Sequence, residues 1–240
     1  MTERSADRYG LVFALLISSF VLDAVFNSPR AQVAILLIYL LALLLGLRAA
    51  SLPRRVGRQF RIALVLGSLV MGAVALMAPS DGTTGALAVW LAVILFVTIA
   101  IILRRVLQHQ AVSMQTIFGA LSAYLLIGFM FAALYAAVAR LGSADFFAGG
   151  QPATASTLQY FSFVTMTTTG YGDFTPAGGA PQSLAVLEAL LGQIFLVTLV
   201  ARLVAMFGQP RPGRLRSSLE RKQEPPAAGQ GLTAGDRDTA

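Results

Sequence analysis

The chain of 240 residues contains no cysteine and a single histidine, His109. A disulfide framework, a thiolate metal site and a histidine metal cluster are therefore excluded. Charged residues are also scarce, at 12%, whereas a soluble domain has roughly 25%. Because candidate nucleophiles, acids and bases are so few, the composition disfavours an enzyme. The hydrophobic share of 56% instead predicts an all-α integral membrane protein.

Long apolar runs support this class. A helix that crosses a bilayer needs about 20 mostly apolar residues. Six such runs predict six transmembrane helices, at approximately 9–27, 31–49, 62–79, 85–104, 117–140 and 182–207. No small-residue cleavage site follows the first run, so we expect it to be retained as a span.

The basic residues indicate an orientation. They cluster before the first predicted span, between the second and third, after the fourth and after the sixth, all on one side of the membrane. The positive-inside rule then places both termini in the cytoplasm and the connection 141–181 outside. This clustering beside apolar spans explains the net charge of +7 better than nucleic-acid binding does.

The outer connection is too long for a simple loop. Its middle, residues 155–167 (ASTLQYFSFVTMT), is apolar but too short to cross the bilayer, which is typical of a re-entrant pore helix. The carboxyl end of such a helix carries a partial negative charge, so it stabilises a cation at the pore centre.

The most specific motif follows this helix, where residues 167–176 read TTTGYGDFTP. In this position between two apolar spans, the motif resembles the selectivity filter of the potassium channel family. The resemblance implies a ladder of backbone carbonyls formed by Thr168, Thr169, Gly170, Tyr171 and Gly172, with K⁺ bound at Thr168, Thr169, Gly170 and Tyr171. The two glycines permit backbone conformations that a Cβ disfavours. Thr169 stands where the family usually has Val or Ile, and its hydroxyl needs a partner.

Side chains of the filter are expected to divide by direction. Thr168 adds a hydroxyl oxygen at the inner end of the ladder, whereas Thr169 and Tyr171 point away from the axis toward the pore helix. We expect Asp173 to concentrate cations at the outer mouth and to brace the filter, and Asp145 to lie on the surface.

Further residues are candidates for filter support, namely Tyr160, Phe161, Thr165, Thr167 and Glu188. Tyr160 and Phe161 are expected to form an aromatic collar, with ordinary aromatic core packing as the alternative. Because an acid is costly in lipid, we expect Glu188 to form a hydrogen bond with the pore helix or the filter backing. A direct influence of Glu188 on gating stays open.

The last apolar run resembles the inner helix of bacterial six-span members of the family. Gly192 lies at a position where these helices often have a gating hinge, and close helix packing is its alternative role. A stripe at helical spacing, expected to line the cavity, consists of Gln193, Leu196, Val200 and Val204. An interhelical hydrogen bond is the alternative role of Gln193.

One ladder per chain has a consequence for assembly. A potassium filter needs four ladders, so the resemblance implies a homotetramer in membrane lipid, with no cofactor besides the bound K⁺. The chain is predicted to contain an N-terminal four-helix domain (1–110), a pore domain (111–208) and a disordered cytoplasmic tail (209–240) that is rich in Pro, Gly and charge.

The N-terminal helices lack the arginine repeat of a voltage sensor. Residues 85–103 carry no charge, and Arg104 and Arg105 are adjacent at the predicted cytoplasmic edge. Asp23 in the first span is expected to pair with a neighbouring helix, with proton or ion sensing as the alternative. These features predict a potassium-selective channel without steep voltage dependence. The alternatives are a channel-like subunit that does not conduct and a secondary cation transporter, which typically has paired repeats.

Overall fold

The computed structural model describes residues 10–20, 41, 54–78, 80–108 and 114–207. A first helix runs from Gly10 to Phe20. The following elements are α3 (Arg54–Met77), α4 (Asp81–Gln108), α5 (Met114–Leu141), α6 (Ala155–Met166) and α7 (Gly179–Phe207). The prediction of an all-α protein is confirmed over these residues. The predictions for Asp23, the tail 209–240 and, apart from residue 41, the span 31–49 lie outside the described residues, as does His109.

Within the part of the chain that the structure describes, three helices are long and apolar enough to cross a membrane. Their candidate spans are Asp81–Arg104 in α4, Ile117–Leu141 in α5 and Gly179–Arg202 in α7. These ranges match the predicted fourth, fifth and sixth spans. Two apolar helical stretches are shorter: Gly10–Phe20 in the first helix and Ile62–Val74 within α3. The total of six spans therefore stays a prediction.

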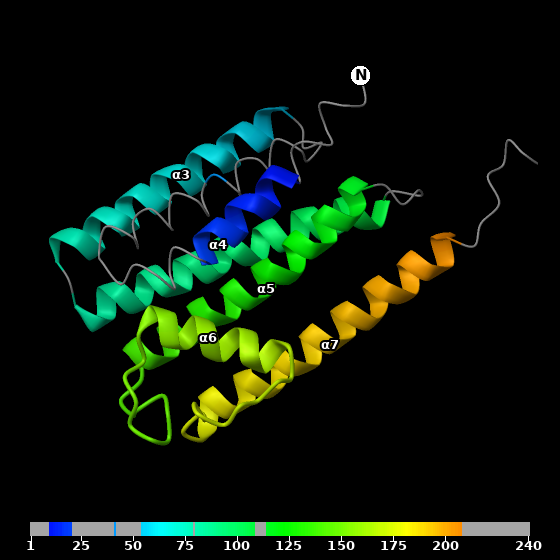
Figure 1. The fold of residues 1–240 in the computed structure, drawn as a ribbon. Coiled ribbons are helices and arrows are strands. Elements are labelled where there is room, and N and C mark those ends of the chain that lie inside the picture. Colours follow the sequence, from blue (N-terminus) through cyan, green and yellow to red (C-terminus); the bar gives the residue numbers. More distant parts are fainter. Residues whose placement is uncertain (1–9, 21–40, 42–53, 79, 109–113, 208–240) are drawn as a thin grey trace, which may run out of the picture.

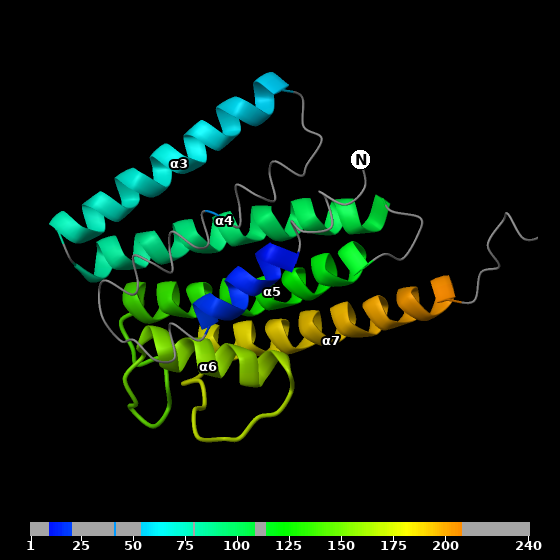
Figure 2. The same cartoon turned by 45° about the horizontal axis from the view of Figure 1, so that its top comes forward.

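The helices pack in a simple order from one side of the molecule to the other. Figures 1 and 2 show α3 beside α4, α4 beside α5, and α7 on the opposite side of α5 from α4. The short α6 packs against both α5 and α7. Val12 and Leu16 of the first helix are buried in the same core as residues of α4, α5 and α6. The core therefore centres on α5, and α6 and the segment after it are positioned by packing against α5.

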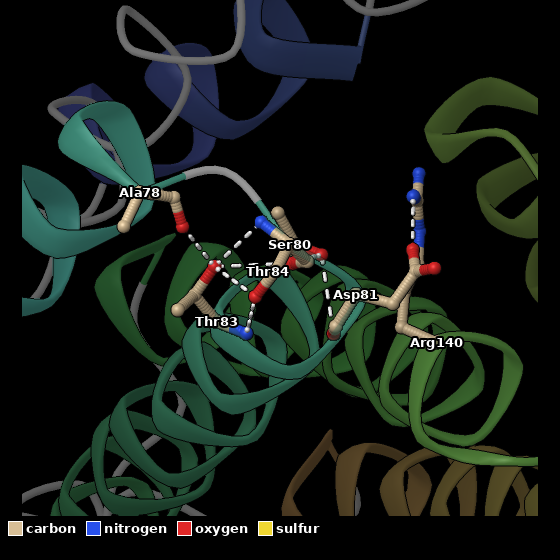
Figure 3. A network of polar contacts seen from close by, with 6 residues as sticks. All are labelled: Ala78, Ser80, Asp81, Thr83, Thr84 and Arg140. Carbon is tan, nitrogen blue, oxygen red and sulfur yellow. Dashed lines mark hydrogen bonds and ion pairs between the residues drawn. The ribbon is translucent and has the colours of Figure 1, made fainter.

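The start of α4 is tied to the end of α5 (Figure 3). Ser80 and Thr83 cap the first turn of α4 reciprocally: the Ser80 amide donates to Thr83 Oγ1 (2.9 Å) and the Thr83 amide to Ser80 Oγ (3.2 Å). Arg140 Nη1 lies 3.2 Å from Asp81 Oδ1. Because both of these charged side chains are exposed, the pair contributes no more than about 1 kcal/mol. Apolar packing of α4 against α5 therefore dominates this junction.

Candidate functional site

The start of α6 is set by local hydrogen bonds. Thr154 is the N-cap residue, and its side chain accepts a hydrogen bond from the Thr157 amide (3.2 Å). In return, the Thr154 amide donates to Thr157 Oγ1 (2.9 Å). This capping box satisfies two amide groups that the first helical turn leaves unpaired. The predicted pore helix at 155–167 is accordingly found as a helix at Ala155–Met166.

The end of α6 leads directly into the predicted filter. The Thr169 amide donates to the Val164 carbonyl (3.0 Å) and the Thr168 amide to the Thr165 carbonyl (2.9 Å). This pair of bonds is a Schellman motif, in which the residue after the C-cap adopts a left-handed conformation. Here that residue is Thr168, with φ of 56°. Glycine is usual at this position, so the threonine holds backbone strain of about 1–3 kcal/mol.

The strained residue begins an alternating backbone pattern. Positive φ occurs at Thr168 (56°), Gly170 (56°) and Gly172 (82°), and not at Thr169 or Tyr171 between them. This alternation of left-handed and ordinary residues is the backbone pattern expected of a segment whose consecutive carbonyls face one side. The sequence analysis included Thr168 in the ladder but expected unusual backbone conformations only at the two glycines, because the left-handed geometry of Thr168 depends on the end of α6.

The outer end of the filter segment is held by α6 and the preceding loop. The rings of Tyr160 and Tyr171 stack with centroids 6.4 Å apart and planes 10° apart. The Tyr160 hydroxyl donates to Asp173 Oδ2 (2.9 Å), and Gln151 Nε2 donates to the Asp173 carbonyl (2.9 Å). The hydrogen bond to Asp173 raises the pKa of Tyr160. Sequence analysis did not identify Gln151, which lies far from the motif along the chain.

Phe161 lies elsewhere. It packs against Tyr135, Phe146 and Phe147 in the buried core, with ring centroids 5.2–5.9 Å apart. Phe147 in turn packs against Phe174, just beyond the filter (5.0 Å). Tyr160 therefore contacts the filter segment directly, whereas the ring contacts of Phe161 are the core packing that the sequence analysis named as the alternative.

The inner end of the filter segment has side-chain partners as well. Thr169 Oγ1 lies 2.9 Å from Thr167 Oγ1, which supplies the partner that the Thr169 hydroxyl needs. Gln193 Nε2 of α7 donates to Thr168 Oγ1 (3.3 Å). The Thr168 hydroxyl donates to the Thr167 carbonyl (2.7 Å). Since a hydroxyl oxygen has two lone pairs, the hydrogen bond from Gln193 occupies one of those on Thr168 Oγ1 and leaves the other.

Glu188 is completely buried behind α6. One carboxyl oxygen is hydrogen-bonded to the Ser162 hydroxyl of α6, and the other accepts a hydrogen bond from the Tyr135 hydroxyl of α5. The expected hydrogen bond between Glu188 and the pore helix is therefore present. Ser162 and Tyr135 were not identified from the sequence, because a serine and a tyrosine in apolar helices give no sign of which helix they face.

Gly192 lies at a close crossing of α7 and α6. A Cβ at this position would be 2.8 Å from both the Met166 carbonyl oxygen and Met166 Cγ. This contact supports the packing role of Gly192 over the hinge role, because the last residue of α6 occupies the space that a side chain would need. α7 also continues as one helix through Gly192 to Phe207.

The rest of the predicted cavity stripe is open in the single chain. Leu196, Val200 and Val204 are 42%, 51% and 66% exposed, and Gln193 is also exposed. Asp145 is exposed, as expected for a surface acid. Among the described residues, no group of three or more His, Cys, Asp or Glu side chains is placed to hold a metal ion. The polar groups that meet at the filter segment are instead hydroxyls, backbone carbonyls, the side-chain amides of Gln151 and Gln193, and the Asp173 carboxylate.

Comparisons with known proteins cover this part of the chain. Residues 119–209 match the family model described as an ion channel. The inward rectifier potassium channel Kirbac3.1 of Paramagnetospirillum magnetotacticum is 35% identical over 82 residues. The aligned part is 34% of this chain and 28% of that relative. The similarity thus extends over little more than a quarter of the relative's length.

Proposed function

We propose that this chain forms a potassium-selective channel that conducts passively across the cell membrane, on the basis of the ion-channel match of residues 119–209 and the similarity to a potassium channel. The observation that carries the proposal is the alternation of positive φ at Thr168, Gly170 and Gly172 directly after α6. Carbonyls that face one side of a segment replace the hydration shell of a potassium ion. The proposed K⁺ sites are at Thr168, Thr169, Gly170 and Tyr171, with Asp173 at the outer mouth.

The proposal includes a homotetramer in which four filter segments surround one axis. Support comes from the exposure of α7. Only 11% of its apolar stretch is buried within the chain, compared with 61% of the apolar stretch of α5. The filter residues from Thr167 to Asp173 are also exposed in the single chain. In this assembly, copies of the chain and lipid cover these surfaces. We further propose that both termini are cytoplasmic, as the positive-inside rule indicates.

Ion flux through the purified protein tests the proposal against its alternatives. We expect the native mass in mild detergent to correspond to four chains, and liposomes containing the protein to pass K⁺ and Rb⁺ far faster than Na⁺. A subunit that does not conduct would give no flux. A secondary transporter would give flux that depends on a coupled ion gradient. A reversal potential near zero in unequal K⁺ and Na⁺ would contradict potassium selectivity.

Conductance is expected to vary only weakly with voltage. One charge that crosses the membrane field contributes about 2.3 kcal/mol per 100 mV, so steep voltage dependence needs several mobile charges. The candidate span of α4 carries Asp81 and Arg104 at its two ends and no charge between them. Single-channel recording across a range of voltages checks this expectation. A steep activation curve would show that gating charges lie elsewhere in the chain.

A further inference from the structure

A buried polar cluster joins three helices behind the filter segment. It consists of Glu188 of α7, Ser162 of α6 and Tyr135 of α5, and none of the three side chains has exposed surface. Ser162 Oγ lies within hydrogen-bond distance of a Glu188 carboxyl oxygen and also 2.7 Å from the Gly128 carbonyl oxygen of α5. The Tyr135 hydroxyl is hydrogen-bonded to the other carboxyl oxygen.

The number of protons in this cluster is informative. Ser162 has one hydroxyl proton, yet it contacts two oxygen atoms that act as acceptors when Glu188 is ionised. The hydroxyl proton can be donated to only one of these two oxygens. A lone pair of Ser162 Oγ would then face a lone pair of the other oxygen, which is repulsive. A proton on Glu188 removes the conflict. Glu188 then donates to Ser162, Ser162 donates to the Gly128 carbonyl, and Tyr135 donates to the second carboxyl oxygen.

The surrounding charges agree with a neutral acid. Both side chains that contact the carboxyl group are uncharged hydroxyls. On α5, the ionisable groups that interact with Glu188 are Tyr135 and Tyr124, while Arg140 is bound to Asp81. On α6, Tyr160 is bound to Asp173 instead. Arg202 of α7 lies 14 residues further along, about 21 Å away. Among the described residues, the contacts of this carboxyl group include no cation, and an ionised carboxylate buried without a cation is strongly disfavoured.

We infer that Glu188 is a protonated, neutral carboxylic acid at neutral pH, and that its proton links α7 through Ser162 to α5 and positions α6. Glu188 lies one helical turn before Gly192, which contacts Met166 at the end of α6. Loss of the proton therefore loosens α6 at the point where it sets the backbone of Thr168. The positioning of a potassium filter rests on the proposed function, whereas the protonation of Glu188 does not.

Infrared spectroscopy of the purified full-length protein tests the protonation without any need for conduction. The difference spectrum of wild type minus Glu188→Gln is expected to contain the carbonyl band of a protonated carboxylic acid at neutral pH. Asp145→Asn, which replaces an exposed carboxyl group by an amide, is the matched control and is expected to leave the protonated-acid band of Glu188 in place. Tyr135→Phe is expected to shift the Glu188 band to higher frequency, since it removes the donor to the carbonyl oxygen.

Thermal unfolding tests the link between the helices. Glu188→Gln is expected to have a Tm at neutral pH no lower than that of wild type, because the amide donates to Ser162 and accepts from Tyr135. Glu188→Leu leaves the Tyr135 hydroxyl without its acceptor and the Ser162 oxygen without its donor, and is expected to lower the Tm by about 4 °C or more. Since Glu188 is protonated in the folded chain and ionised in the unfolded chain, wild type is expected to lose stability relative to Glu188→Gln as the pH rises above about 4.3, the ordinary pKa of glutamate. Carboxylate bands from Glu188 at neutral pH, or the same pH dependence of the Tm in both proteins, would overturn the inference.

Discussion

Replacing Gly170 with Ala is expected to abolish potassium selectivity or flux. Gly170 has φ of 56°, and a residue with a Cβ in this left-handed conformation costs about 1–2 kcal/mol. In the proposed tetramer the cost recurs four times, so the total of about 4–8 kcal/mol favours a flipped backbone that turns the carbonyl away from the ion. The permeability ratio of K⁺ to Na⁺, measured from reversal potentials, is expected to fall at least about tenfold.

Gly178→Ala is the matched control for this prediction. Gly178 has φ of 72°, and a Cβ meets no heavy atom within 4 Å at either glycine. Both substitutions therefore carry backbone strain without a steric clash inside the chain, but Gly178 lies outside the ladder. Gly178→Ala is expected to retain selectivity. If Gly170→Ala also retained it, the carbonyl ladder would have to lie elsewhere.

Replacing Gly192 with Ala is expected to destabilise the pore domain and to disturb the filter. The added Cβ would lie 2.8 Å from the Met166 carbonyl oxygen, which is backbone and therefore cannot rotate away. Overpacking of this kind costs about 1–3 kcal/mol for each chain. Since Met166 ends α6 two residues before Thr168, separation of α6 from α7 also moves the inner end of the ladder. Tm and the K⁺ to Na⁺ permeability ratio are both expected to fall.

Gly128→Ala is the control that separates a clash with backbone, as expected at Gly192, from a clash with movable side chains. A Cβ at Gly128 would lie 2.8 Å from Phe163 Cζ and 3.1 Å from Met166 Cε, which are the ends of side chains that can move. Gly128→Ala is therefore expected to lower the Tm less than Gly192→Ala does. A hinge predicts a different result for Gly192→Ala, namely unchanged Tm and selectivity with a shifted open probability. That combination would restore the hinge role of Gly192.

Local patterns explain why several sequence predictions agree with the structure. The start of α6 follows from Thr154 and Thr157, which cap the helix through bonds between residues three apart. The candidate spans in α4, α5 and α7 follow from the lengths of three apolar runs. The ion-channel match at 119–209 agrees with the potassium channel resemblance of the motif at 167–176. Each of these features depends on residues close together in the chain.

Roles that depend on distant residues were decided only by tertiary structure. The sequence left Gly192 with two possible roles, a gating hinge and close helix packing. The proximity of the Met166 carbonyl at the crossing of α6 and α7 favours the packing role. An aromatic at Phe161 suits either a filter collar or a core, and its contacts with Phe146 and Phe147 place it in the core.

The sequence by itself determined the helical class, the filter motif and the helix that precedes it, because apolar run length, helix caps and glycine placement are local properties of the chain. Tertiary structure decided that Glu188 meets Tyr135 and Ser162, which lie 53 and 26 residues away. It also decided that Gln193 reaches Thr168 from another element, 25 residues along the chain. The physical reason is that a buried hydrogen bond depends on which helix faces meet, and this follows from the packing of whole helices.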